Sequence, residues 1–238
     1  MFDKWTQYNY RAQKYQQNRL LKIILAFLAF YIAYNCLTAF VVSVWVVENN
    51  SMQSGLSSGD RIVFASFESW LRIINDDPHP FKRGSIVLVD KGRNAERVLA
   101  LRVIDGIVRF FTAQKISLFT GDGQYYIKRV IALPGDEISM VNYVFRVKTA
   151  GNSYSFTEFE LSDKPYHPAI PQTPHLWDES LPFSGHMDPI VLGPDECFVV
   201  SDDRSNTNDS RTWGPVSPSM ITAKALLRFW PVNKFEIF

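Results

Sequence analysis

The sequence contains few cysteines, almost no net charge and no internal repeat. Its two cysteines, Cys36 and Cys197, lie in very different segments of the 238-residue chain, so we expect no disulfide framework. A net charge of +1 gives no reason to expect nucleic acid as a partner. The length leaves room for one sizeable domain and an anchor, not for two large domains.

Charge is also missing from one long segment, because no charged residue occurs between Lys22 and Glu48. The run ILAFLAFYIAYNCLTAFVVSVWVV exceeds the roughly 20 apolar residues that a bilayer-spanning helix needs. It is also longer than the apolar core of about 7–15 residues in a cleaved signal peptide. We therefore predict a transmembrane helix over residues 23–47, and the alternative is a helix buried in a protein core.

The residues that flank this run predict its orientation. Residues 1–22 carry five basic side chains against one acid, and positively charged flanks stay in the cytoplasm. We expect a cytoplasmic tail over residues 1–22 and an extracytoplasmic domain over residues 48–238. The prediction is a single-pass protein of the plasma (inner) membrane, with the lipid bilayer as a partner.

The outer domain is predicted to be mainly β, built from antiparallel sheets with long loops. Short β-branched or aromatic runs are bounded by Gly, Pro, Asp and Asn, as strands are: RIVFASF, GSIVLVD, YYIKRVIAL, EISMVNYVFRV, ECFVVSD and ALLRFWPV. Residues 93–125 and 148–196 are expected to be insertions. Within the first, residues 96–119 predict an amphipathic helix that lies either in the membrane interface or against the β core.

A serine becomes a good nucleophile only when a neighbouring base removes its proton. All four histidines lie in loop sequence: His79, His167, His175 and His186. A lysine can serve instead if burial lowers its pKa. Lys128, in the apolar run QYYIKRVIALPGD, is the candidate, although the strand pattern alone favours an exposed edge strand.

A polar patch near the end of the chain, VVSDDRSNTNDSRTWGPV, covers residues 199–216. It does not fit a calcium loop, because the oxygen ligands do not fall at alternate positions, the central glycine is missing and the twelfth position has no glutamate. Its arginines also oppose a cation. We instead expect a rigid turn cross-linked by carboxylate–guanidinium pairs, which could hold the base in position.

Three patches of the sequence that follow the apolar run, residues 51–60, 126–136 and 201–216, resemble in this order the motifs of the bacterial type I signal peptidase family. The nucleophile patch of that family reads S-M-x-P-T-L followed by G-D, and here SMQSGL, residues 51–56, precedes Gly59-Asp60. The base patch Y-x-K-R-V-I-G-L-P-G-D is matched by residues 126–136, with Ala132 in place of Gly. The last patch, G-D-N-R-x-N-S-x-D-S-R-x-W-G-P-V, is matched by residues 201–216, and residues 83–87 resemble the R-G-D-I-V strand.

The resemblance implies a role for each aligned residue. Ser51 would be the nucleophile, Lys128 the general base and Thr207 the hydroxyl that orients the base. Asn49 would donate to the oxyanion together with the Ser51 N–H. The resemblance further implies two groups: Asp202, Arg204, Asp209 and Arg211 would brace the turn, and Met52, Leu56, Tyr126 and Ile127 would line shallow pockets for small side chains.

The implied function is a membrane-bound serine endopeptidase that removes signal peptides from exported preproteins after Ala-x-Ala-like sites. No metal or organic cofactor is expected. Ser54-Gly55 in place of Pro-Thr is expected to loosen the nucleophile loop, and Ser201 replaces the usual Gly. The alternatives are a processing peptidase of the same type with narrow specificity and an inactive, membrane-tethered β module that binds exported partners. A self-cleaving protease of the phage-repressor type fits less well, because such proteins carry a helix-turn-helix and no membrane span.

Overall fold

The computed structural model describes residues 3–40, 42–66, 81–91, 125–172 and 185–238. Within the first helix it describes the side chains of residues 14–33. The amphipathic helix predicted over residues 96–119 lies outside the described residues, as do His79 and His175.

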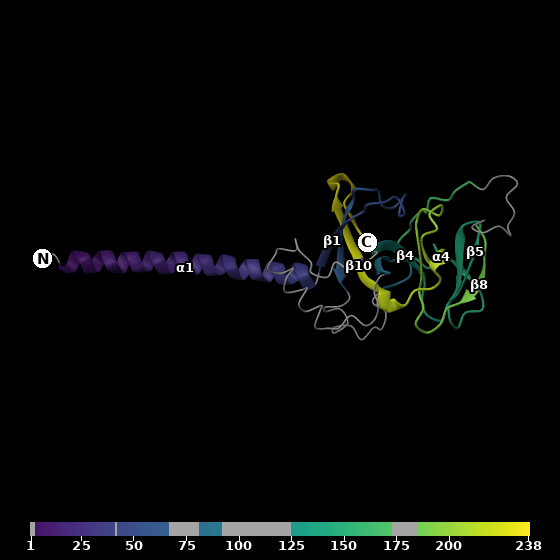
Figure 1. Cartoon of the computed structure of the whole chain (residues 1–238), viewed down its shortest axis with the longest axis horizontal. Helices are drawn as coiled ribbons and strands as arrows, with labels where there is room; N and C mark the ends of the chain where they lie inside the picture. The colour runs from purple at the N-terminus through teal and green to yellow at the C-terminus, as the bar shows by residue number, and fades with distance from the viewer. Residues whose placement is uncertain (1–2, 41, 67–80, 92–124, 173–184) are drawn as a thin grey trace.

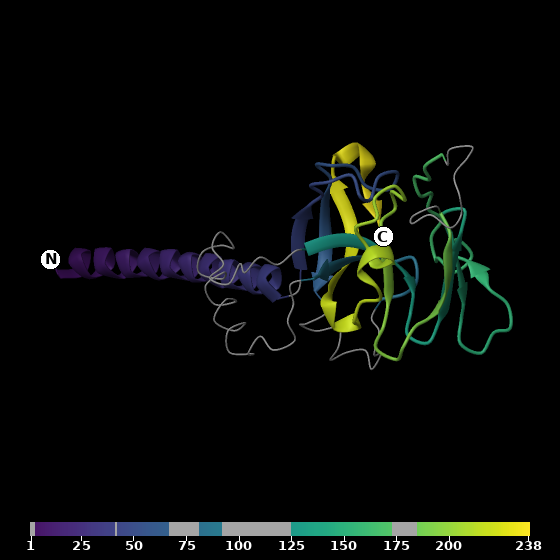
Figure 2. The same cartoon turned by 45° about the vertical axis from the view of Figure 1, so that its right-hand side comes forward.

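A long N-terminal helix, α1 (Asp3–Phe40), extends away from a body built of strands (Figures 1 and 2). The helix ends at Phe40 rather than at Val47, because the next residues form strand β1 (Val42–Val46). The sequence VSVWV favours a strand through its β-branched and aromatic side chains, and it pairs in register with β2 (Arg61–Ser66). Among the residues that the structure describes, no helix is both long and apolar enough to cross a membrane.

Two antiparallel sheets make up the body, which confirms the mainly β prediction. The larger has the order β1-β2-β10-β3-β4-β9, with β11 (Glu236–Ile237) paired to β10; its other strands are β3 (Ile86–Asp90), β4 (Tyr125–Ala132), β9 (Phe198–Val200) and β10 (Ile221–Trp230). The smaller has the order β7-β6-β5-β8: β5 (Glu137–Val141), β6 (Val144–Lys148), β7 (Phe156–Thr157) and β8 (Met187–Val191). Three one-turn helices follow β9: α4 (Ser210–Trp213), η2 (Pro218–Met220) and η3 (Val232–Lys234).

All six runs predicted as strands contain strand. The run EISMVNYVFRV forms two strands, β5 and β6, because Asn142 and Tyr143 adopt positive φ angles of 53° and 64° and turn the chain. Residues 148–196 are more than an insertion, since they contribute β7 and β8 to the smaller sheet. Figure 1 shows β5 and β8 at the end of the body far from α1.

A buried ion pair joins the segment after β7 to a turn over residues 201–211, called here the 201–211 turn. The Nη2 atom of Arg204 lies 2.5 Å from Oε2 of Glu158, and both side chains are fully buried. The Tyr166 hydroxyl donates to the same carboxylate oxygen at 2.6 Å. A second guanidinium nitrogen, Nη1, donates to the Tyr143 carbonyl oxygen at 3.2 Å. Glu158 therefore holds the turn against the smaller sheet.

Replacing Glu158 by Ala should lower the free energy of unfolding by about 3–5 kcal/mol, because it leaves the Arg204 charge buried without its partner. Chemical denaturation of the detergent-solubilised chain measures this. Asp163→Ala is the control, because the Lys82–Asp163 pair is exposed (74% and 70%); such a pair contributes less than about 1 kcal/mol. Equal effects of the two variants would contradict the anchoring role.

Candidate active site

Ser51 lies in the loop between β1 and β2, and backbone hydrogen bonds close this loop at its base. The Val47 N–H donates to the Asp60 carbonyl oxygen at 2.9 Å, and the Gly59 N–H donates to the Val47 carbonyl oxygen at 2.8 Å. Met52 and Leu56 are completely buried in the apolar cluster that also holds Ile62, Phe64, Ile86 and Leu88. Burying each such side chain stabilises the fold by about 1.5–3 kcal/mol. The loop is thus a fixed support for Ser51, whose side chain is nearly buried.

Ser54 and Gly55 make hydrogen bonds that connect the loop to other parts of the chain. Ser54 has a φ of 88°, which proline cannot adopt, and its hydroxyl donates to the His167 carbonyl oxygen. The Gly55 carbonyl oxygen accepts a 2.8 Å hydrogen bond from Arg228. A Cβ on Gly55 would lie 3.3 Å from Oδ2 of Asp202, so the small residue allows close packing. These contacts take the place of the rigidity that proline would give.

Lys128 lies on β4, between β3 and β9, so the exposed-edge interpretation of its strand is wrong. Its side chain is 1% exposed, and its Nζ donates to Oγ of Ser201 at 2.8 Å. The rings of Tyr126 and Trp213 have their centroids 5.8 Å and 5.7 Å from Nζ. Burial lowers the pKa of Lys128 from 10.5 to about 8, although the Asp209 carboxylate opposes the shift. With this pKa about a tenth of the lysine is neutral amine at pH 7, far more than for a lysine with a pKa of 10.5.

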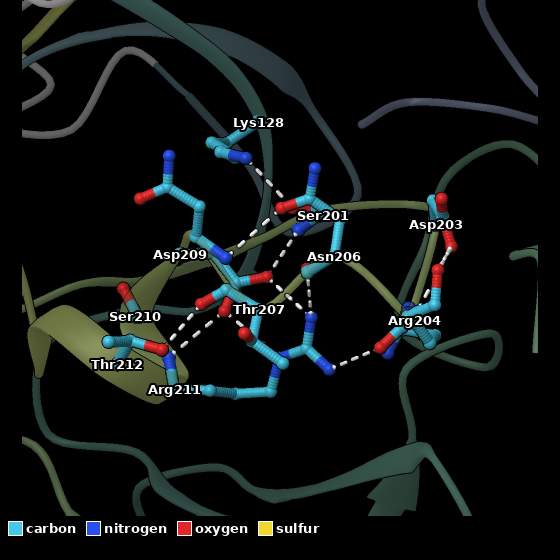
Figure 3. Close-up of polar contacts among 12 residues, drawn as sticks. Lys128, Ser201, Asp203, Arg204, Asn206, Thr207, Asp209, Ser210, Arg211 and Thr212 are labelled. Carbon is cyan, nitrogen blue, oxygen red and sulfur yellow. Dashed lines mark hydrogen bonds and ion pairs between the residues drawn. The ribbon is translucent and has the colours of Figure 1, made fainter. Parts of the chain in front are cut away.

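The hydroxyl that contacts Lys128 is not the one that the sequence predicted. Thr207 was expected to orient the base, but its described hydrogen bonds are made by its carbonyl oxygen, which accepts from the Asp209 N–H and the Thr212 hydroxyl. Ser201 was noted only as a departure from the family pattern. Figure 3 shows the Lys128 amine directed at Ser201.

The predicted carboxylate–guanidinium pairs exist, and two of them reach residues outside the turn. Asp209 and Arg211 do pair within the turn, through two hydrogen bonds of 2.9 Å and 2.7 Å (Figure 3). Asp202 instead binds Arg129 through two bonds of 2.8 Å and 2.6 Å. Arg204 binds Glu158 across the sheets. The carboxylates of Asp202 and Asp209 are therefore engaged by arginines and not arranged as cation ligands.

Hydrogen bonds also connect the Ser51 loop to the 201–211 turn. The Asp203 N–H donates to the Ser51 carbonyl oxygen at 3.0 Å. The Ser51 N–H donates to the Asn49 Oδ1 atom at 3.1 Å, so one of the two expected oxyanion donors is hydrogen-bonded within the loop. Among the described hydrogen bonds, none joins Ser51 Oγ to the Lys128 amine. In unliganded active sites such bonds are often long and tighten only when substrate binds.

A pocket of about 260 Å³ opens beside Ser51. Of the residues predicted to line it, Met52 and Ile127 do so, whereas Leu56 is a core residue and Tyr126 packs on Trp213 with ring centroids 4.9 Å apart. The prediction missed six lining residues that come from β1, the segment after it, β3 and the start of β4: Trp45, Val46, Val47, Glu48, Leu88 and Tyr125. The lining residues up to Val47 were missed because residues 23–47 were assigned to the transmembrane helix.

Comparison with known proteins identifies the family. The profile described as "Signal peptidase, peptidase S26" matches residues 19–230, and the chain belongs to this family. It is 26% identical over 195 residues to "Probable signal peptidase I-2" of Synechocystis sp.; this is 82% of the chain but 66% of that relative, slightly less than two thirds. It is 22% identical over 217 residues to "Signal peptidase IB" of Staphylococcus aureus, with 91% of each chain covered. The family resemblance inferred from the three patches is confirmed.

Replacing Lys128 by Met should raise stability, because a similar volume stays filled and no amine has to be desolvated. The folded pKa of about 8 lies below 10.5, so folding with Lys128 costs about 3 kcal/mol at pH 7. The cost falls as pH rises from about 8 to 10.5, where the unfolded lysine also loses its proton. The gain over wild type should therefore be largest at pH 7 and shrink towards pH 10.

Denaturation of both proteins at pH 7 and pH 10 measures this difference. Lys148→Met is the matched control, because the Lys148 side chain is 44% exposed and its removal relieves no buried amine. A Lys128→Met variant that is less stable than wild type at pH 7 would contradict the desolvation account.

Proposed function

We propose that the chain is a serine endopeptidase that removes N-terminal signal peptides from exported preproteins. The observation that carries the proposal is the buried Lys128 amine, with its pKa lowered to about 8, on β4, whose Ile127 lines the same pocket as Ser51. A lysine that is buried away from solvent at a cost in stability, with a lowered pKa, is typical of a general base. Membership of the signal peptidase family supports the same reaction.

The reaction is acyl transfer to Ser51. Neutral Lys128 takes the proton from the Ser51 hydroxyl as its oxygen attacks the scissile carbonyl carbon. The lysine, now an ammonium, gives a proton to the leaving amine, and the C–N bond breaks. Water then attacks the acyl-enzyme with Lys128 again as the base, which releases the carboxylate of the signal peptide and restores Ser51.

Oxyanion stabilisation requires a local change at Asn49. The Ser51 N–H donates to Asn49 Oδ1 in the free protein, so the substrate carbonyl oxygen has to replace that acceptor. A rotation of the Asn49 side chain would then present its Nδ2 group as a second donor. The amide is suited to both states because it contains an acceptor and a donor.

The substrate proposal is cleavage after small residues, as in Ala-x-Ala. The pocket beside Ser51 is modest in size, and Met52, Leu88 and Ile127 give it apolar walls. Methyl-sized side chains bury apolar surface there without needing polar partners.

Membrane attachment is also part of the proposal, with residues 23–40 crossing the bilayer and the N-terminus in the cytoplasm. Support comes from exposed apolar side chains on β1, at the end of β10, and on η3 and β11, which follow it. They are Val44 (57%), Val46 (48%), Trp230 (50%), Val232 (71%), Phe235 (58%) and Ile237 (62%). Exposed apolar side chains in such numbers are typical of a membrane or protein contact. A bilayer contact would hold the Ser51 loop near the membrane surface, where the cleavage site of a signal peptide emerges.

Wild type should cut a preprotein with an Ala-x-Ala site in detergent, whereas Ser51→Ala should be inactive. Lys128→Ala should lower kcat by about 10²–10⁴-fold, because the base is lost. Ser58→Ala is the matched control: its hydroxyl, on the same loop, bonds only the Glu48 carbonyl oxygen among the described contacts, so activity should persist.

Product analysis distinguishes the alternatives. Cleavage of very few preproteins, still dependent on Ser51, would indicate the narrow-specificity peptidase. A folded wild type that binds preproteins but cuts none would favour the binding module and contradict the proposed reaction.

Asn49→Asp should lower kcat by about 10²–10³-fold, since the carboxylate still accepts the Ser51 N–H but cannot donate to the oxyanion and repels it. Asn49→Ser, which restores a donor, should recover most of the rate. Steady-state kinetics of both variants on one preprotein make the comparison. Equal activity of Asn49→Asp and wild type would contradict the oxyanion role.

A further inference from the structure

A serine hydroxyl that the family pattern does not contain occupies the position beside the base. Ser201 is completely buried, directly follows β9 and stands where the family motif has glycine. Its Oγ accepts the Lys128 amine at 2.8 Å. Glycine at this position could not make that contact.

The strand register explains why Ser201 reaches Lys128. In the antiparallel pairing of β4 with β9, Val130 lies opposite Val199 and Arg129 lies opposite Val200. Continuing that register by one residue places Lys128 opposite Ser201. The Ser201 N–H is fixed separately, since it donates to Oδ2 of Asp209 at 2.9 Å. The backbone of Ser201 is thus held by the end of a paired strand and by the Asp209–Arg211 pair (Figure 3).

Thr207 is engaged elsewhere. Its carbonyl oxygen accepts the Thr212 hydroxyl at 2.6 Å and the Asp209 N–H at 2.8 Å, which ties it to the start of α4. Within the described part of the chain, its own hydroxyl makes no hydrogen bond. Thr207 is also partly exposed, whereas Ser201 and Lys128 are not.

We propose that Ser201 is the positioning residue of this site: its hydroxyl accepts one N–H of Lys128 and thereby directs the amine lone pair towards Ser51. The role of orienting the base has moved from the 207 position to the 201 position. This inference rests on the proposed function, because it assigns Lys128 as the base. The Tyr126 and Trp213 rings limit where else the amine can lie, and the Ser201 bond selects one direction within that space.

Loss of the hydroxyl should have two coupled effects. A hydrogen bond to the ammonium favours the charged form, so its removal should lower the pKa of Lys128 further. The pH at which activity rises should then shift downwards. At the same time the amine loses its orientation, and misplacement of a reacting group by about 1 Å can cost 10²-fold in rate. A purely structural role would change neither the pH profile nor kcat selectively.

The test compares Ser201→Ala, Ser201→Thr and Thr207→Val in the full chain in detergent, with thermal melting of each as the check on folding. We expect Ser201→Ala to lower kcat by about 10- to 100-fold with little change in KM. Its pH–rate profile should rise at lower pH than that of wild type. Ser201→Thr should recover activity because it restores a hydroxyl, and Thr207→Val should match wild type.

A second measurement does not depend on cleavage. Carbon-13 reductive methylation followed by NMR titration reports the pKa of Lys128, with the Lys128→Met variant used to assign its signal. Ser201→Ala should lower that pKa, and Thr207→Val should leave it unchanged. If wild type cuts no preprotein, the proposed function fails, but this titration still tests the contact.

Two results would overturn the inference. One is a loss of kcat in Thr207→Val that equals or exceeds the loss in Ser201→Ala. The other is a pKa and pH profile of Lys128 that stay at their wild-type values in a folded Ser201→Ala protein.

Discussion

Desolvation of the Lys128 amine is the constraint around which the rest of the site is arranged. Burial on an interior strand shifts the lysine towards its neutral form, and the fold loses about 3 kcal/mol of stability in doing so. The surroundings limit the cost without cancelling it, because the Asp209 carboxylate is itself paired with Arg211. A free carboxylate at that place would restore the ammonium and remove the base. The turn therefore limits how far the Asp209 carboxylate raises the pKa of Lys128, because Arg211 lowers it.

Three buried ion pairs keep this arrangement in place, and two of them join segments that are far apart in the sequence. Arg129 and Asp202 connect β4 to the start of the 201–211 turn, and Arg211 and Asp209 close the turn itself. Arg204 and Glu158 fasten it to the segment after β7. Buried pairs contribute little net stability compared with apolar contacts, but breaking one is costly. Other arrangements of the turn would break these pairs and are therefore less stable. The site depends on this, because the Lys128 amine has to keep one orientation.

Much of the fold and site could be predicted from local sequence. Periodic β-branched runs predicted the strands around Ser51 and Lys128, and two long motifs predicted the family. The errors arose where distant segments decide the outcome. β1 was hidden within an apolar run, because the long uncharged segment predicted a helix and the pairing of VSVWV with β2 cannot be seen in the sequence. The contact of Ser201 with Lys128 depends on the β4–β9 register, and the burial of Lys128 depends on β4 having a neighbour on each side. Neither property can be read from one strand alone.

The account depends on a neutral lysine that activates Ser51, and the acylation of Ser51 as a function of pH tests this most directly. The full chain in detergent would be treated with an acylating inhibitor, and the modified residue identified and followed by mass spectrometry. The account predicts modification at Ser51, with a rate that rises as Lys128 loses its proton and reaches half its maximum near pH 8. A rate that stays flat between pH 6 and 9, or that is unchanged in Lys128→Met, would contradict it.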